Sequence, residues 1–402
     1  MTPKARLLSA LAIAAAISGP AIGQTYDIGA TDTEVKIGQT KPYSGPASSY
    51  GVGGTTWLRY FDMINEAGGI NNRKIVLLSE DDGYSPPKTV ELVRRLIERD
   101  EVLFLAGNLG TATNTAILDY VNDSEIPHLL VGSGSSKFND MEGHPWTMAF
   151  TPNYHTEGRT FGAYIAKEMP EAKVGILYQN DDSGKDILMG LEEVLAENGI
   201  SENLVVETSY ESTDPTVDSQ IIAMQSAGVE VIVSFGLPRI TAQVIRKKTD
   251  IGYDPVILIG NVGSSVESGL APAGKENAVG VITDQFLMDP ADPDVQSSED
   301  FQEFAAFMDK WYPEGDKTDL TVVQGYVEAK VVEQIIRQAG DELTRENILK
   351  QARSLDTDVP MLLEGIRVNT SDTDNLIIDQ AVLAKFDGEK WVPFGGVLGG
   401  SD

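Results

Sequence analysis

Short apolar runs alternate along the chain with longer segments in which apolar residues recur every three or four positions. Residues 34–38 are typical of a strand, and residues 88–99 are typical of a helix with one apolar face. The Pro86-Pro87 pair precedes that helix, as prolines often do at a first helical turn. Further strands are expected at residues 74–78, 102–106, 128–131, 173–178, 205–208, 229–235, 256–259, 380–386 and 390–392. Further helices are expected at residues 57–67, 113–121, 156–167, 185–197, 216–227, 240–250, 301–311, 322–339 and 345–353.

This alternation predicts an α/β fold in which helices cover parallel sheets. The chain has 402 residues, which is long enough to predict at least two domains. Residues 77–83 and 176–184 are similar to each other, because each places an acidic turn after a strand and before a helix. That similarity favours two related lobes. In such folds, ligands bind at the carboxyl ends of the strands.

Composition narrows the classes of function. Acidic residues number 61 against 31 basic ones, for a formal net charge of -30. Nucleic-acid binding and anionic membrane surfaces are therefore not expected, since both need clustered Lys and Arg. The chain has no cysteine and only three histidines, so disulfides, thiolate metal sites and histidine-rich metal sites are not expected either. We expect no cofactor and no bound metal.

The first 23 residues have the pattern of a secretory signal peptide. Lys4 and Arg6 give a positive start, residues 7–17 are apolar, and Ala21-Ile22-Gly23 ends the segment with small residues. The apolar stretch is too short to span a bilayer. We expect cleavage after Gly23 and a periplasmic location for the mature protein.

Two polar turns follow neighbouring predicted strands and are candidates for a ligand site. The first turn is Gly107-Asn-Leu-Gly-Thr-Ala-Thr-Asn114, and the second is Gly132-Ser-Gly-Ser-Ser136. If the turns are adjacent, their hydroxyl and backbone N–H groups can hold one carboxylate. The alternative is that these Ser and Thr residues only cap helices.

Catalytic motifs are scarce. The chain has no G-x-S-x-G elbow, no P-loop, no G-x-G-x-x-G and no H-E-x-x-H. The acidic pairs Asp81-Asp82 and Asp181-Asp182 can act as acid and base or bind calcium, but solvated turn residues explain them as well. A secreted α/β hydrolase stays open as an alternative, with Ser133 activated by His128 or His155. A receptor ectodomain is a third alternative, without a membrane span to support it.

The sequence resembles the type I periplasmic solute-binding proteins of the leucine/isoleucine/valine-binding class, which serve ABC importers. The resemblance covers essentially the whole chain after residue 23. It rests on these segments: Val35-Lys-Ile-Gly-Gln-Thr, Ser44-Gly-Pro-Ala-Ser-Ser-Tyr-Gly51, Ile64-Asn-Glu-Ala-Gly-Gly-Ile70-Asn, Glu80-Asp-Asp-Gly-Tyr-Ser-Pro-Pro-Lys88, the turn at 107–114, and Ile176-Leu-Tyr-Gln-Asn-Asp-Asp-Ser-Gly-Lys-Asp186.

The resemblance implies two Rossmann-like lobes that are joined by three crossovers and close on a ligand. Residues 24–149 and 285–366 would form lobe I, and residues 150–284 and 367–402 would form lobe II. The crossovers would fall near Phe150, Asp284 and Ile366. The implied partners are a small-molecule ligand with a carboxylate and the permease subunits of an ABC importer in the inner membrane.

The resemblance also implies a set of ligand-binding residues. Thr111, with the backbone at Leu109, Gly110 and Thr113, matches the position that binds the ligand carboxylate. Ser133 and Ser135 match a second carboxylate turn, and Tyr50 matches an aromatic cleft residue. The lobe II side is matched by Asp182, Ser183, Phe235, Asn261 and Val262. We add Tyr154 as a stacking residue, because it lies just past the first crossover.

One departure from the family pattern concerns the ligand. Amino-acid binders of this family usually present an acid of lobe II to the ligand ammonium, near what is here Gly260-Asn-Val-Gly263. This stretch has no acid before Glu267. Burying an ammonium without a counter-charge is costly, so an α-amino acid is put in doubt. Residues 145–148 and 152–154 are similar to family members associated with aromatic or other small organic acids. Both ligand classes stay open.

Overall fold

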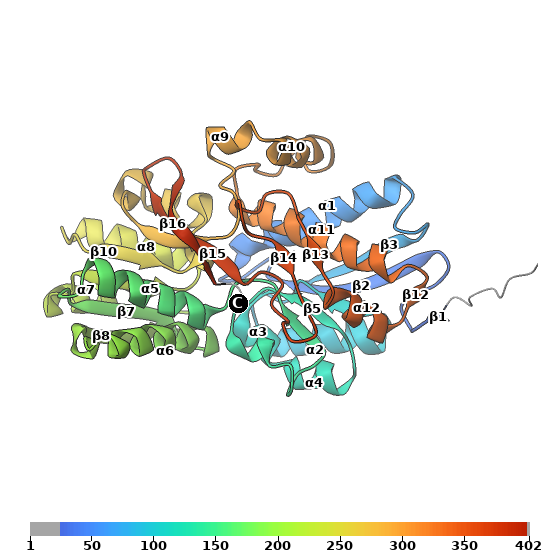
Figure 1. The fold of residues 1–402 in the computed structure, drawn as a ribbon, viewed down its shortest axis with the longest axis horizontal. Helices are drawn as coiled ribbons and strands as arrows, with labels where there is room; N and C mark the ends of the chain where they lie inside the picture. Colours follow the sequence, from blue (N-terminus) through green and yellow to red (C-terminus); the bar gives the residue numbers. More distant parts are fainter. Residues whose placement is uncertain (1–24, 400–402) are drawn as a thin grey trace, which may run out of the picture.

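The structure is a computed structural model that describes residues 25–399. The predicted signal peptide, residues 1–23, lies outside the described residues. Two sheets organise the chain into two lobes placed side by side (Figure 1). We call them lobe I, built on a five-stranded sheet, and lobe II, built on a seven-stranded sheet. The predicted α/β class with parallel sheets is confirmed.

The sheet of lobe I is entirely parallel, in the order β3-β2-β4-β5-β6. Its strands are β2 Glu34–Lys41, β3 Lys74–Asp81, β4 Phe104–Ala106, β5 His128–Val131 and β6 Thr147–Ala149. They are short and mostly buried, as expected for strands covered by helices on both faces. The helices that join them are α1 Gly51–Glu66, α2 Pro86–Glu98, α3 Thr111–Thr115 and α4 Leu118–Asp123.

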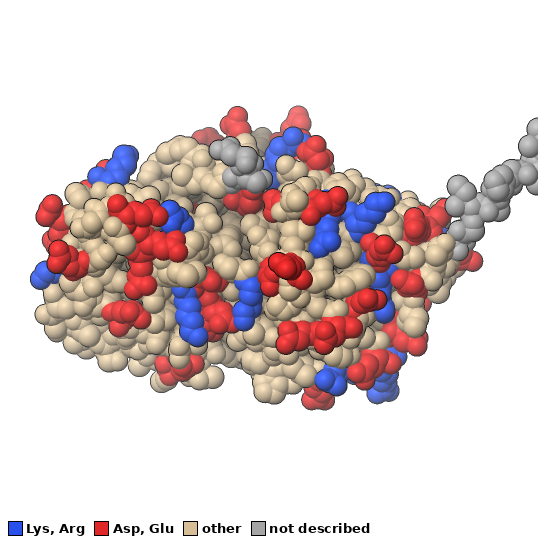
Figure 2. Space-filling view, turned by 60° about the horizontal axis from the view of Figure 1, so that its bottom comes forward, with Lys and Arg blue, Asp and Glu red and all other residues tan. Residues whose placement is uncertain are grey.

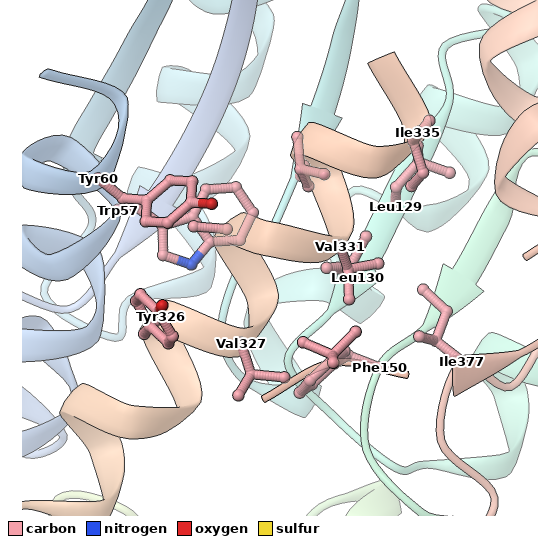
Figure 3. Close-up of a cluster of buried hydrophobic side chains, with 14 of the residues drawn as sticks. Trp57, Tyr60, Leu129, Leu130, Phe150, Tyr326, Val327, Val331, Ile335 and Ile377 are labelled. Atoms are coloured by element: carbon pink, nitrogen blue, oxygen red, sulfur yellow. The ribbon is translucent and has the colours of Figure 1, made fainter. Parts of the chain in front are cut away.

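A later part of the chain completes the core of lobe I. It contributes α9 Pro293–Gln296, α10 Glu299–Trp311, α11 Leu320–Ala339 and α12 Arg345–Ala352. Tyr60 of α1 meets Tyr326 of α11 edge to face, with ring centroids 5.6 Å apart. Figure 3 shows α11 between Trp57 and Tyr60 on one side and Leu129, Leu130 and Phe150 on the other. Helix α11 is therefore a central packing element, which explains its many buried residues.

The sheet of lobe II has the order β16-β15-β11-β10-β9-β7-β8. Five parallel strands come first in the chain, at β7 Val174–Gln179, β8 Leu204–Tyr210, β9 Val231–Phe235, β10 Val256–Ile259 and β11 Ile282–Gln285. The antiparallel strands β15 Gln380–Phe386 and β16 Trp391–Gly399 extend that sheet. Its covering helices are α5 Tyr154–Glu168, α6 Asp182–Glu197, α7 Asp218–Ala227 and α8 Pro238–Asp250.

The chain passes between the lobes three times. It leaves lobe I after β6, leaves lobe II after β11, and returns to the sheet of lobe II at β15. Between residues 367 and 379, where we expected lobe II to begin, strand β14 (Val368–Asn369) pairs with β13 (Asp356–Thr357). Ile377 also belongs to the core of lobe I, and its N–H donates to the Ala149 carbonyl. This segment stays on lobe I because its apolar residues pack there, and the chain enters the second sheet only at Gln380.

One predicted helix is two helices in the structure. The expected helix at residues 113–121 starts earlier, at Thr111, and breaks between α3 and α4. The Thr113 hydroxyl donates to the Leu109 carbonyl, and the Asn114 amide donates to the Gly110 carbonyl. Such bonds from side chains to the backbone compete with the helical ladder, which explains the break.

The other elements are short. Strand β1 (Thr25–Tyr26) pairs with β12 (Glu342–Leu343), and several single turns of helix lie between residues 261 and 278. No helix between residues 25 and 399 is both long and apolar enough to cross a membrane.

Candidate ligand-binding site

A cleft between the two lobes contains most of the predicted site. Its empty space, including the open mouth, is about 920 Å³. Residues of both lobes line it, as expected for ligands that bind at the carboxyl ends of the strands. Nine predicted residues are among them: Tyr50, Leu109, Gly110, Thr111, Tyr154, Ser183, Phe235, Asn261 and Val262.

The other four predicted residues do not line the cleft. The Thr113 hydroxyl is buried and bonds backbone carbonyls, at 2.6 Å from the Leu109 oxygen. Ser133 lies behind Thr111, with 2.7 Å between the two hydroxyl oxygens. Ser135 is buried, and its hydroxyl has no partner in the described part of the chain. Asp182 forms an ion pair with Lys137 across the two lobes.

The two polar turns of lobe I lie side by side, as the sequence suggested. A parallel bridge joins Leu109 to Gly132, and the Gly110 N–H donates to the Gly132 carbonyl at 3.1 Å. Gly110 has φ 105°, a conformation that a residue with a Cβ rarely adopts. The glycine therefore allows the turn to place Thr111 in the cleft wall with Ser133 directly behind it.

Aromatic side chains form another part of the cleft wall. The rings of Tyr154 and Phe235 meet edge to face, with centroids 4.8 Å apart. Tyr154 is the first residue of α5, which Asn153 caps by accepting from two backbone N–H groups. Burial raises the pKa of the Tyr154 hydroxyl above its ordinary value, so that hydroxyl stays neutral at any physiological pH.

Two charged residues of the cleft were missed by the sequence reasoning. Lys41, at the end of β2, and Glu328, in the middle of α11, form a buried ion pair with 3.4 Å between Nζ and Oε2. Both side chains are at least 98 % buried, with exposed fractions of 2 % and 1 %. The available signal for Glu328 was its place between Val327 and Ala329 in the predicted helix, with an apolar residue on each side.

Several contacts cross the cleft from one lobe to the other. The Tyr50 hydroxyl donates to the Val262 carbonyl, and the Gln179 amide donates to the Tyr84 hydroxyl at 3.3 Å. The Ser136 N–H donates to the Asp186 carboxylate at 2.9 Å. The lobes are thus in direct contact around the cleft.

The acids on the lobe II side of the cleft are already engaged. Asp181 caps α6, because its carboxylate accepts from the Ser183 and Gly184 N–H groups and from the Gln179 amide. Glu157 lies behind Asn261 and accepts its N–H at 2.7 Å. Burial next to Asp284 raises the pKa of Glu157 well above its ordinary value, so this carboxyl keeps its proton. Neither acid lines the cleft as a free carboxylate.

The residues of the hydrolase alternative are not assembled into a catalytic pair. The recorded partners of the Ser133 hydroxyl are the Thr111 hydroxyl, the Tyr154 side chain and the Ser135 N–H, none of which is a base. Both ring nitrogens of His128 are buried without a partner among the described residues, and burial lowers its pKa to about 3. His155 pairs with Glu193 instead. Residues 25–399 hold no cluster of three or more His, Asp and Glu side chains suited to a metal ion.

Comparisons with known proteins agree with this architecture. A Leu/Ile/Val-binding protein homologue of Brucella suis is 22 % identical over 264 residues, which are 64 % of this chain and just under two thirds (63 %) of that relative. A branched-chain amino acid ABC transporter protein of Thermus thermophilus, solved with bound valine, superposes with a TM-score of 0.82 at 16 % identity, covering 92 % of this chain and 98 % of that one. A solute-binding protein of R. palustris, solved with benzoate, has a TM-score of 0.77 at 18 % identity, with the same coverage of 92 % and 98 %.

The family assignment rests on a match to a family model rather than on any single relative. The model of the family described as periplasmic binding protein matches residues 34–390, which is most of the chain. The matched region includes the whole sheet of lobe I, the lobe II sheet except β16, and every residue that lines the cleft. The predicted resemblance is thereby confirmed, and the chain belongs to the periplasmic binding protein family.

Proposed function

We propose that this protein captures a small carboxylate-bearing solute in the cleft and delivers it to the permease of an ABC importer. The observation that carries the proposal is the pair of adjacent turns in lobe I. Thr111 lies in the cleft wall, and its hydroxyl is 2.7 Å from the Ser133 hydroxyl of the second turn. Hydrogen bonds to a charged acceptor contribute about 1.5–3 kcal/mol each, so a few of them support micromolar binding.

Catalysis finds no support at the same place. A serine nucleophile needs a base within hydrogen-bond reach, and the side-chain partners of Ser133 are Thr111 and Tyr154 instead. The proposal is therefore a binding role, without chemistry on the solute. The related proteins whose names mention Leu, Ile and Val, valine or benzoate support a small carboxylic acid as the ligand.

The far end of the solute is proposed to lack an α-ammonium group. Asp181 and Glu157 are engaged away from the cleft surface, so lobe II offers no free carboxylate there. The rings of Tyr154 and Phe235 offer apolar surface instead. Matched pairs test this choice: calorimetry with 4-methylpentanoate against leucine and with 3-phenylpropanoate against phenylalanine. At least tenfold tighter binding of the amino acids, about 1.4 kcal/mol, would show that a carboxylate of the cleft pairs with their ammonium group.

Substitution of Thr111 tests the carboxylate site itself. Thr111→Val keeps the shape of the side chain and removes its hydroxyl, so we expect acids to bind about 1–3 kcal/mol more weakly by calorimetry. The matched control is Thr115→Val in the same helix, because the Thr115 hydroxyl has no partner in the described chain and does not line the cleft. Unchanged affinity in Thr111→Val would mean that Thr111 has a structural role only.

A periplasmic location is part of the proposal. The basic start and the short apolar segment before Ala21-Ile22-Gly23 support export and cleavage before Gln24. The permease is the implied partner, since soluble binding proteins of this family need a membrane component to move the solute. Mass spectrometry of the periplasmic fraction reads the mature N-terminus directly.

A further inference from the structure

The Lys41–Glu328 ion pair lies in the cleft wall, and the proposed carboxylate site does not use it. Its Nζ–Oε2 distance is 3.4 Å, and both side chains are almost fully buried. The pair joins the end of β2 to the middle of α11, elements that are far apart in the sequence. Taking two charges out of water costs several kcal/mol for each ion, and a pair of apolar residues often packs as well. A structural reason alone therefore explains the pair poorly.

The two partners are held very differently. Glu328 accepts three hydrogen bonds, from Lys41, from the Trp57 indole at 3.0 Å and from the Gln324 amide at 2.8 Å. The Lys41 ammonium has a single recorded hydrogen bond, to Glu328, and lies 6.0 Å from the centroid of the Trp57 ring. An ammonium group carries three N–H donors, so two donors of Lys41 are left for a molecule in the cleft. Glu328 thus positions the Lys41 ammonium, and the ammonium keeps N–H donors for hydrogen bonds to a solute.

Lys41 is a positive charge inside a strongly acidic protein. The net charge is -30, and acidic side chains outnumber basic ones on the face in Figure 2. Such a surface repels anions at long range, although salt screens this field beyond about 8–10 Å. Lys41 is the only Lys or Arg among the residues that line the cleft. It is therefore the local positive charge that an anionic solute meets inside.

We propose that Lys41 binds a second oxygen acceptor of the solute, and this inference rests on the proposed function. The solute is then a short acid with a second carboxylate, carbonyl or hydroxyl oxygen. One carboxylate binds at the Thr111 turn, and the second oxygen accepts from the Lys41 ammonium. Lys41 ends β2, Thr111 starts the helix that follows the neighbouring strand β4, and both residues line the same cleft. We therefore expect one short solute to reach both anchors.

Calorimetry with matched acids tests the inference. The probes are butyrate against succinate, and pentanoate against glutarate and 4-oxopentanoate. We expect the wild-type protein to bind each acid with a second oxygen at least tenfold more tightly than its monocarboxylate. Lys41→Met should reduce that preference to less than threefold while the affinity for pentanoate changes little. The control is Lys310→Met, because Lys310 lies on the surface and pairs with Glu66 there.

A second variant covers the case in which Lys41→Met does not fold. That substitution leaves the Glu328 carboxylate buried without its counter-ion. Lys41→Met combined with Glu328→Gln removes both charges and leaves the Gln324 and Trp57 contacts in reach of an amide. We expect the double variant to fold and to bind monocarboxylates without preferring dicarboxylates. A double variant that keeps the wild-type preference would overturn the role of Lys41.

The remaining outcomes separate this inference from the proposed function. If butyrate, pentanoate and their partners all fail to bind the wild-type protein, and 4-methylpentanoate and 3-phenylpropanoate fail as well, the carboxylate-binding function falls together with the inference. If monocarboxylates bind and the second oxygen adds nothing, the inference alone is overturned. Tighter binding of 4-aminobutyrate than of succinate would mean that Glu328, and not Lys41, binds the second group of the solute. That result would also overturn the inference.

Discussion

Single residues of the cleft wall depend on buried groups behind them. Asn261 is fixed on two sides: its N–H donates to Glu157, and its side-chain amide donates to the Asp284 carbonyl at 2.8 Å. Glu157 hydrogen-bonds the Asp284 carboxyl, and both groups are buried. Two carboxylates cannot both stay ionised at such a place, so the pair holds a proton. Asn261 is therefore positioned by a protonated carboxyl pair.

This pair predicts a pH dependence of stability. An exposed Glu in the unfolded chain has a pKa of about 4.3, whereas burial raises the pKa of Glu157 well above that value in the folded protein. Above about pH 4.3 the folded state therefore binds more protons than the unfolded state, and stability falls as pH rises towards the folded pKa, by up to about 1.4 kcal/mol per pH unit. Glu157→Gln keeps an acceptor for Asn261 and should remove this fall.

Melting temperatures between pH 5 and 8 check that expectation. The wild-type protein should lose stability with rising pH more steeply than Glu157→Gln. Glu202→Gln is the control, since Glu202 is exposed. Parallel pH profiles for the wild type and Glu157→Gln would mean that Glu157 is ionised in the folded protein.

The position of some cleft residues could be predicted from the sequence, and that of others could not. Thr111 and Asn261 lie in the turns that follow β4 and β10, so their position at the carboxyl edge follows from the local pattern. Lys41 also ends a strand, but the direction of its side chain depends on Glu328, which is 287 positions away. Such a long-range contact leaves no local signal. The sequence therefore places the residues of the cleft edge better than it identifies the charges inside.

At the scale of the elements, the turn that connects β4 to α3 has a strict geometry. Gly110 has φ 105°, and a Cβ there would lie 2.5 Å from the Tyr84 ring and 2.7 Å from the Thr113 hydroxyl. Gly110→Ala therefore strains the backbone and pushes the turn away from its place. We expect the variant to lose about 1–3 kcal/mol of stability and to bind acids more weakly, as measured by melting and calorimetry.

Gly68→Ala is the control that separates backbone strain from displacement of the turn. Gly68 has nearly the same backbone angle, φ 107°, but a Cβ there meets nothing within 4 Å. This control should lose stability through backbone strain alone and keep its affinity for acids. Equal affinities of Gly110→Ala and the wild type would show that the turn does not hold the solute.

Long periodic elements are predictable from the sequence, and short ones are less so. Helix α10 and helix α11 start within two residues of their expected starts and end at the expected residue. Strands β6 and β11 were not expected, because runs of three or four residues carry little periodicity. The break between α3 and α4 was missed for another reason, since it depends on side-chain bonds of Thr113 and Asn114 to the backbone.

At the scale of the whole molecule, the lobes enclose the cleft and touch around it. Lys137 pairs with Asp182, the Tyr50 hydroxyl bonds the Val262 carbonyl, and the Ser136 N–H bonds Asp186. Each contact joins lobe I to lobe II. Three passages of the chain connect the lobes, which permits a hinge motion in which these contacts form and break. The order of the lobes along the chain was predictable. The residue at which the chain crosses to lobe II for the last time was not, because it depends on where residues 367–379 pack.

The central claim is that a small carboxylate binds between the lobes and holds them together. Small-angle scattering with and without the acid that gives the largest thermal stabilisation tests it most directly, with the corresponding neutral amide as the control. The account predicts that the radius of gyration falls at saturation with the acid and stays unchanged with the amide. A radius that is the same with and without saturating acid, or that falls equally with the amide, would contradict it.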